Sequence, residues 1–412
     1  MQETISATVN KLGTFRSALN LTPIAFDRTA VNNALHFLEQ KEFPTTREEA
    51  WKYTRLAKLS NTLFTGEIKS FSGQLPAAHK DAFRFVFENA KLTQSQEEIA
   101  TSITKVDAEK LSGVKAEASL FEALNLAYAE EGLLIEIPKK TQLEKPIEIV
   151  QISSNNKASN VRHIIRLGDF AEAEITLIYA SNENSNGFLN VVADIELGVG
   201  AKLTLHKLQV EKGTDYHFSR ENARQEKDST LTINTITLNG NFVRNDVNVK
   251  VAGQNAETNL NGAYLLKNNQ LVDNHTVIDH LEAHCQSNEL YKGVVYDKAT
   301  AVFNGKVFVR PDAQKINAFQ SNANVLMSDE ASVNSKPELE IYADDVKCSH
   351  GSTTGQLDEE SVFYLRARGI SEKSARNLIV AAFTGEVFEK IENEEVLAFV
   401  QAHANERFGW EI

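Results

Sequence analysis

The sequence predicts a mainly β protein with helical ends. From about residue 133 to residue 355 the chain consists of short runs rich in Ile, Val, Leu and Thr, without a long helical pattern. Small and turn-forming residues separate these runs. Before residue 130 and after residue 357, apolar residues follow helical spacing instead. We therefore expect an N-terminal mainly helical domain (1–130), a β core (131–356) and a C-terminal helical domain (357–412).

The composition narrows the function classes. A chain of 412 residues is too long for one compact core, so several domains or an elongated repeat architecture are expected. The net charge of −13 argues against nucleic acid or an anionic membrane as the main partner. The two cysteines cannot build a disulfide framework, which indicates a reducing compartment and predicts a cytoplasmic protein. The first ten residues show no export signal, and no run approaches the roughly 20 apolar residues of a membrane helix.

In the N-terminal part, Thr46 followed by Glu49 fits a capping box, in which two side chains satisfy free amide groups at the start of a helix. The helix beginning there would carry Ala50, Trp51, Tyr53 and Leu56. We interpret its aromatic residues as an anchor to a core rather than as chemical groups.

The β core begins with five predicted strands, at 133–137, 147–152, 161–167, 173–179 and 189–197. Turn signals follow at 168–169, 198–200, 227–229, 252–254, 296–298, 311–312, 328–329 and 343–344. They recur at roughly 25 to 30 residues early and roughly 15 to 17 later, in the range of stacked repeats. Since no helical crossovers are visible, an antiparallel sandwich and a β-helix both remain open.

After residue 357, two helices separated by Gly369 are predicted, and Ser371 is a good N-cap for the second. One apolar face of this second helix follows three-and-four spacing: Ala375, Leu378, Ile379, Ala382, Phe383, Val387 and Ile391. The face could pack against the end of the β core or bind another protein. A last helix is expected at 394–408.

The segment 342–355 is the first candidate chemical site. If it is extended, the period of two places Val346, Cys348 and His350 on one face of the strand. A thiolate and an imidazole are suitable iron ligands. Without further information, however, a strand cysteine is usually a small buried apolar residue and a lone histidine a hydrogen-bonded structural one.

The run from Asn274 to Cys285 is the second candidate. His280 and His284 would share a face either on a strand, together with Glu282, or on a helix. These two histidines and Cys285 could therefore hold a metal ion, although the zinc motif His-Glu-x-x-His is absent. We favour a structural role for the histidines and keep the metal or sulfur-transfer role as the alternative.

Other catalytic signatures are missing from the sequence. It contains no Gly-x-x-x-x-Gly-Lys-Ser/Thr phosphate loop, no Gly-x-Ser-x-Gly nucleophile elbow and no Cys-x-x-Cys pair. A scaffold is therefore favoured over a self-contained enzyme.

Several segments resemble the SufB/SufD family of iron–sulfur cluster assembly proteins. They are Arg47 to Thr54, Ser287 to Val294, Val302 to Val307, Cys348-Ser-His350-Gly351 and Phe363 to Gly369. The form of the last two is that of the SufD branch. The resemblance implies a right-handed parallel β-helix core, flanked by the two helical domains.

The resemblance also implies a function: a non-catalytic scaffold that pairs with SufB and recruits the ATPase SufC. A nascent cluster would be built at the SufB junction near Cys348 and His350, with no permanently bound cofactor and at most a transient iron–sulfur cluster shared with SufB. In isolation the chain could form a homodimer. The region expected to dock SufC contains Leu357, Phe363, Tyr364, Arg366, Arg368, Leu378 and Phe383.

Two other interpretations stay open from the sequence. The chain could be a SufB-like scaffold or a self-pairing homologue. More distantly, it could be a β-helix enzyme acting on acidic polysaccharide, but the rows of basic and acidic residues and the export signal expected of such enzymes are not evident.

Overall fold

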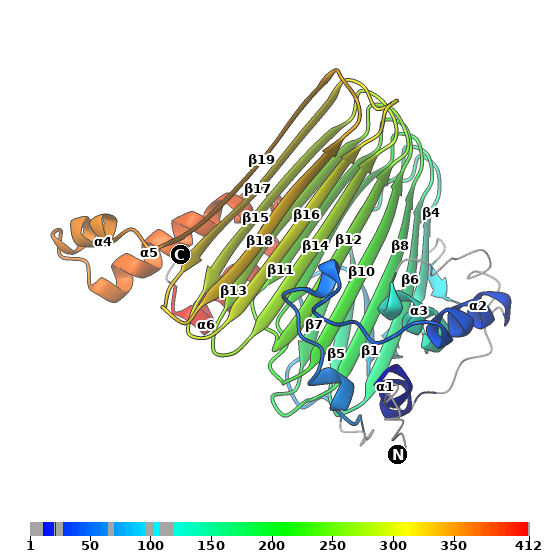
Figure 1. Ribbon diagram of the computed structural model, residues 1–412, viewed down its shortest axis with the longest axis horizontal. Helices are drawn as coiled ribbons and strands as arrows, with labels where there is room; N and C mark the ends of the chain where they lie inside the picture. Colours follow the sequence, from blue (N-terminus) through cyan, green and yellow to red (C-terminus); the bar gives the residue numbers. More distant parts are fainter. Residues whose placement is uncertain are drawn as a thin grey trace, which may run out of the picture.

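The computed structural model describes residues 11–19, 21, 28–64, 70–95, 103–106 and 119–410. The core is a parallel β-solenoid of about eight turns (Figure 1). The mainly β class with helical ends is thereby confirmed, and the stacked repeat is a solenoid rather than an antiparallel sandwich. The first ten residues, in which an export signal was not expected, lie outside the described residues.

Each turn of the solenoid contributes one strand to each of two sheets. The ten-stranded sheet contains β1 (Phe83–Glu88), β2 (Lys91–Ser95), β5 (Ile147–Ser153), β7 (Glu172–Ser181), β9 (Lys202–Gln209), β11 (Thr230–Thr237), β13 (Glu257–Leu266), β15 (Gln286–Val295), β17 (Ile316–Leu326) and β19 (Val346–Gln356). The nine-stranded sheet contains β3 (Ile103–Lys105), β4 (Leu133–Ile137), β6 (Ala158–Leu167), β8 (Phe188–Leu197), β10 (Tyr216–Gln225), β12 (Phe242–Val251), β14 (Leu271–His280), β16 (Thr300–Val309) and β18 (Ser332–Ile341). Among the strand pairs of the described residues, only β1–β2 and β3–β4, at the N-terminal end, are antiparallel.

All eight predicted turn signals lie at corners of the solenoid, but other corners, including those at Lys140 and His284, were not predicted. On one edge the chain reverses through residues with positive φ that stand between 27 and 31 residues apart: Lys140, Phe170, Gly200, Asp228, Asn255, His284 and Lys315. In the nine-stranded sheet, the carboxyl end of each strand from β4 to β16 is therefore followed by a corner that contains one residue with positive φ. The regular spacing keeps successive strands in parallel register.

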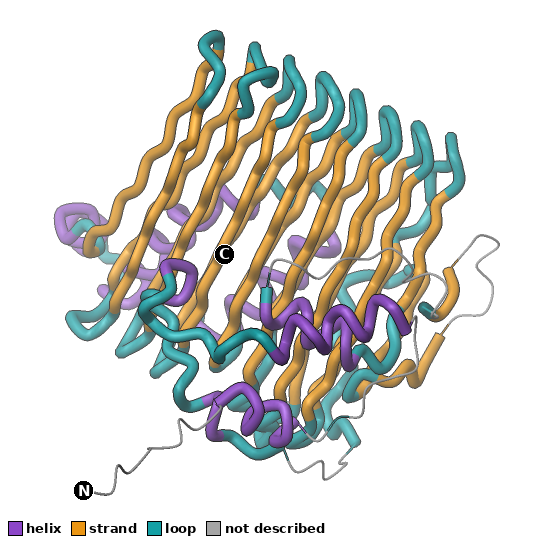
Figure 2. The backbone as a smooth tube through the Cα atoms, turned by 45° about the vertical axis from the view of Figure 1, so that its right-hand side comes forward, coloured by secondary structure: helices purple, strands orange, loops and turns teal. Residues whose placement is uncertain are grey.

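Helices cover the outer faces of both sheets (Figure 2). The outer face of the nine-stranded sheet packs against α1 (Lys11–Leu19), α2 (Arg28–Glu39) and α3 (Leu120–Tyr128). The outer face of the ten-stranded sheet packs against α5 (Glu372–Phe388) and α6 (Glu394–Phe408), while α4 (Glu359–Arg366) precedes α5. The two helices separated by Gly369 and the last helix at 394–408 are present as predicted, and the Ser371 hydroxyl caps α5 by accepting from the Ser374 amide. No helix within the described ranges is both long and apolar enough to cross a bilayer.

The predicted capping box of Thr46 and Glu49 is wrong. The segment forms only one 3-10 turn, η1 (Glu49–Trp51), and the Glu48 carboxylate instead accepts from the Thr45 amide at 3.0 Å. Tertiary contacts dominate here, because Arg244 donates to the Ala50 carbonyl at 3.0 Å and lies 4.4 Å from the centre of the Trp51 ring. Trp51 is buried, as expected of an anchor.

Candidate functional site

The last turn of the solenoid forms an open end. β18 and β19 stand at the ends of their sheets, so each has one edge without a neighbouring strand among the described residues. Their side chains are half-buried or exposed along the whole length, unlike those of earlier turns. Figure 1 shows this end beside α4 and the start of α5, which extend away from the solenoid.

Cys348 and His350 stand two residues apart on β19, in register with Ala318 and Gln320 on β17. Both partners are buried and face the solenoid interior, so the two candidate residues belong to the interior-facing side of β19. Cys348 is half-buried and packs on the end of the apolar core, where burial raises the pKa of its thiol. His350 is exposed.

A groove of about 1200 Å³ leads from His350 across the ten-stranded sheet. It passes the exposed ring of Phe319 and reaches Glu174 and His206 near the loop between α5 and α6. Glu257, Glu386, Glu389 and Glu392 line it, against Lys202 and Lys390, so the groove carries an excess of negative charge.

The second candidate run does not form one cluster. His280 ends β14 and is buried, its ring hydrogen-bonded to the Ser287 hydroxyl at 2.9 Å, and burial lowers its pKa to about 4. His284 is exposed at a corner. Cys285 is fully buried and donates to the Gly253 carbonyl oxygen at 3.2 Å. Within the described ranges, no three His, Cys, Asp or Glu side chains are grouped closely enough to hold a metal ion.

The predicted docking region divides into exposed and buried residues. Phe363, Tyr364 and Leu378 are 72%, 56% and 44% exposed. Arg366 and Arg368 are also exposed, and the Arg368 guanidinium lies 3.6 Å from the centre of the Tyr364 ring. In contrast, Leu357 is buried in the core beneath α5 and Phe383 is half-buried. These two residues stabilise the helices on the solenoid, so they are less suited to contact a partner.

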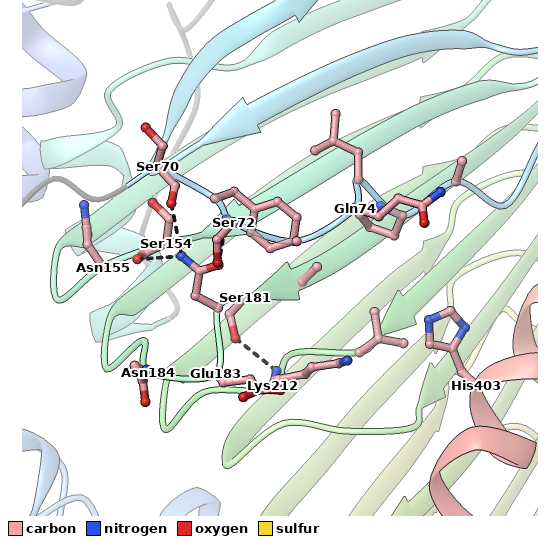
Figure 3. Close-up of a pocket in the computed structure, with 18 of the residues that line it drawn as sticks. Ser70, Ser72, Gln74, Ser154, Asn155, Ser181, Glu183, Asn184, Lys212 and His403 are labelled. Carbon is pink, nitrogen blue, oxygen red and sulfur yellow. Dashed lines mark hydrogen bonds between the residues drawn. The ribbon is translucent and has the colours of Figure 1, made fainter.

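A second hollow, of about 900 Å³, lies between residues 70–77, three solenoid corners and α6 (Figure 3). Asn182 connects its walls, since its amide accepts from the Ser72 amide and donates to the Ser154 carbonyl, both at 3.1 Å. Lys212 and His403 also line it. The hollow is thus built mainly by side chains that hold loops together.

The comparisons with known proteins bear on this arrangement. The family model described as "SUF system FeS cluster assembly, SufBD core domain" matches residues 150–383, which is most of the solenoid together with α4 and part of α5. The chain belongs to this SufBD family. It is a family of scaffold proteins of iron–sulfur cluster assembly.

Individual SufBD relatives agree along most of the chain. It is 30% identical over 382 residues to the iron–sulfur cluster assembly protein SufD of Escherichia coli, covering 88% of this chain and 89% of that one. It is 29% identical over 389 residues to a SufBD family protein of Synechocystis, covering 87% and 86%. SufD of Bacillus subtilis is 25% identical over 304 residues, covering 69% and 66%. These similarities make the chain SufD-like.

Sequence reasoning missed two polar residues directly behind the exposed histidine of this SufBD member. Gln320 donates to the buried Glu289 carboxylate at 2.5 Å, and both stand in the register row that ends at His350. Gln320 lies outside every segment singled out from the sequence, and Glu289 lies in the family-like segment Ser287 to Val294 but was given no role there. The signal that could have indicated this site is a glutamate at a strand position that alternation places in the interior.

Proposed function

We propose that this chain is the SufD-type scaffold subunit of a SUF complex. It pairs with a SufB subunit through the β18–β19 end of the solenoid and recruits the ATPase SufC through α4 and α5. A nascent iron–sulfur cluster is built at the junction with SufB. The observation that carries the proposal is that His350 is exposed on a terminal strand whose outer edge has no neighbouring strand in the described part of the chain.

The terminal turn is suited to strand addition. The interior of β19 is rich in small residues, from Ser349 to Gly355, and it presents free backbone groups that a strand of similar form could pair with. Apolar side chains are exposed nearby, because Phe319, Ile341 and Tyr342 are 47%, 41% and 57% exposed. Exposed aromatic residues of this kind commonly anchor protein interfaces. In the absence of SufB, the same end would support a homodimer.

The chemistry of the junction follows from its two candidate ligands. His350 can offer a neutral imidazole to iron, while Cys348 must lose its proton before it binds as a thiolate. Two ligands from one chain leave room for ligands from SufB. The cluster would therefore be transient and shared, and this subunit would catalyse no turnover itself.

The α4–α5 hairpin supports the assignment of SufC. Arg376 on α5 donates to the Glu359 carboxylate on α4 at 2.9 Å, which fixes the angle between the two helices. The hairpin presents Phe363, Tyr364 and Leu378 to solvent. An ATPase bound there could change the position of the terminal turn, because the two elements are joined directly by residues 357 and 358.

The ligand role is tested by co-expressing the chain with SufB and SufC and measuring iron and sulfide in the purified complex. We expect His350→Ala to lower both several-fold without changing the mass of the complex. His36→Ala serves as the control, since this histidine is exposed on α2, far from β19 in the sequence. Wild-type cluster content in the His350 variant would refute the ligand role.

The two docking surfaces are tested by binding. Phe319→Glu should release SufB, whereas Leu63→Glu, which places the same charge at a position that is 69% exposed, should not. The double variant Phe363→Ser and Tyr364→Ser should release SufC and keep SufB. Retention of both partners by all variants would place the interfaces elsewhere.

A further inference from the structure

The interior of the solenoid is polar along two adjacent rows of the ten-stranded sheet. Successive strands in register contribute Lys207, Thr235, Gly262, Tyr291, Asn322 and Ser352 to one row, and Gln209, Thr237, Tyr264, Gly293, Asn324 and Thr354 to the other. Apart from the two β19 residues, all of them are buried. Most of these positions carry polar side chains. Buried polar groups require hydrogen-bond partners, which the apolar core cannot offer.

In each row, a tyrosine on one strand stands beside a glycine on the neighbouring strand: Tyr291 beside Gly262, and Tyr264 beside Gly293. A Cβ atom on Gly262 would stand 2.2 Å from the Tyr291 ring, and one on Gly293 would stand 2.1 Å from the Tyr264 ring. Each ring therefore lies over the backbone of its neighbour. The Tyr264 hydroxyl donates to Asn324 at 2.5 Å and accepts from Asn322 at 3.0 Å.

From Asn322 the hydrogen bonds continue to the terminal turn. Its side-chain oxygen accepts from the Ser335 hydroxyl at 2.7 Å, and this hydroxyl in turn accepts from the Ser352 hydroxyl at 2.7 Å. Ser352 is exposed, two residues from His350. The polar interior is thus connected to solvent at the terminal turn.

Glu289 lies on β15, two residues before Tyr291, and is in register with Gln320 on the next strand, β17. It is 3% exposed, and among the described residues no Lys, Arg or His side chain forms an ion pair with it. Burial raises the pKa of Glu289 to about 7, although Gln320 and Thr276 partly offset the rise. A carboxyl group in this state changes its protonation near neutral pH.

Two buried oxygen atoms at this site have no hydrogen-bond partner in the protein: Oε1 of Glu289 and Oε1 of Gln320. Leaving a buried polar atom unpaired costs about 1–3 kcal/mol. Bound water removes that cost where several polar atoms converge, because one water molecule makes about three hydrogen bonds. Two unpaired oxygen atoms on neighbouring residues are therefore positioned to share a bound water.

We propose that Glu289 and Gln320, with water bound between them, form a buried proton-exchange site behind His350. The proposal rests on the function proposed above, because it assigns the protons to cluster assembly at the terminal turn. A thiol that binds iron as a thiolate releases one proton. That proton passes through bound water to the Glu289 carboxylate, which becomes a neutral carboxyl group and later returns the proton to solvent. No electron is transferred.

The first test uses the isolated chain and infrared spectroscopy. We expect the band of a protonated carboxyl group to disappear between about pH 6 and pH 8. The contribution of Glu289 should be lost in Glu289→Gln, which leaves only that of the buried Asp215, whose pKa burial raises to about 6. The whole band should be retained in Glu257→Gln, the same chemical change at an exposed position of the neighbouring strand β13. Gln320→Leu removes a donor to the carboxylate and should shift the band to higher pH. If no such band titrates in the wild-type chain, the proposal is overturned.

The second test measures the rate of cluster formation in the complex with SufB and SufC as a function of pH. The wild-type rate should rise as Glu289 becomes a carboxylate, and Glu289→Gln should lose that rise while still binding both partners. A Glu289→Gln profile identical to wild type would overturn the proton-exchange role. Failure of the ligand proposal itself would appear separately, as unchanged cluster content in His350→Ala.

Discussion

Lys292 on β15 donates a hydrogen bond of 2.8 Å to the main-chain carbonyl oxygen of Phe383 on α5. The ammonium group also contacts the Glu386 carboxylate at 2.5 Å and lies 4.6 Å from the centre of the Phe383 ring. The ammonium group of one buried lysine thus joins α5 to the solenoid. If SufC binds this helix, the contact is a mechanical connection between the ATPase and the strands behind the terminal turn.

Replacing Lys292 by methionine should loosen α5 while keeping most of the side-chain volume. Losing a hydrogen bond from a charged donor costs about 2 kcal/mol, and the effect should be concentrated in the C-terminal helices. Hydrogen exchange of the α5 amides measures it. In the control, Lys298→Met removes an exposed ion pair with Glu330 and should cost less than about 0.5 kcal/mol. Equal protection of α5 in both variants would contradict this connection.

The tyrosine rings in the interior predict a strong dependence on glycine. Gly293→Ala would place a methyl group on the Tyr264 ring and disturb its hydrogen bonds to Asn322 and Asn324, so it should lower the free energy of unfolding by more than about 2 kcal/mol. Gly355→Ala is the matched control, because no heavy atom lies within 4 Å of its added carbon. Chemical denaturation of both variants decides the comparison. Similar midpoints would show that the interior can rearrange.

Buried histidines predict a loss of stability in mild acid. Burial lowers the pKa of His280 to about 4, whereas in the unfolded chain it titrates near 6.5. Between these values the unfolded state binds more protons, so stability is retained above pH 6.5 and lost as the pH falls towards 4. One such group should cost about 2 kcal/mol between pH 7.5 and pH 5. The free energy of unfolding of His280→Gln, measured at both pH values, should fall by about 2 kcal/mol less than that of the wild-type chain. An equal fall in the two proteins would contradict the assignment.

Much of the fold could be predicted because its rules are local. Runs rich in Ile, Val, Leu and Thr predicted β4 to β8. Several corners contain a Gly, Asp or Asn residue that tolerates positive φ, although Lys140, Phe170, His284 and Lys315 adopt it at others. The end of α4, the Ser371 cap and the last helix were equally visible. The 3-10 turn at Trp51 was not, since Arg244 lies almost 200 residues away in the sequence and its contacts decide that conformation.

The candidate site was predictable only in part. Alternation along β19 places Cys348 and His350 on one side, which the sequence alone indicated. The position of Glu289 behind them depends on the register of β15, β17 and β19, and strands about 30 residues apart carry no local signal of that register. The predicted apolar face of α5 is also divided: Val387, and Ile391 just beyond the end of the helix, are buried against the solenoid, whereas Leu378 is exposed because the start of the helix extends past the sheet.

The two cysteines should differ in reactivity, and the difference reports on the terminal turn. Cys285 is fully buried, whereas Cys348 is half-buried at the open end, and burial raises the pKa of both thiols. Because the thiolate is the reactive form, alkylation should be slow for both at neutral pH and faster as the pH rises, with Cys348 modified first. Mass spectrometry of peptides after timed alkylation measures the two rates, and Cys348→Ser identifies the faster site. Binding of SufB over β19 should then protect Cys348 and leave Cys285 unchanged. If Cys348 reacts equally fast with and without SufB, the terminal strand is not covered in the complex, and the proposed junction must lie on another face of the solenoid.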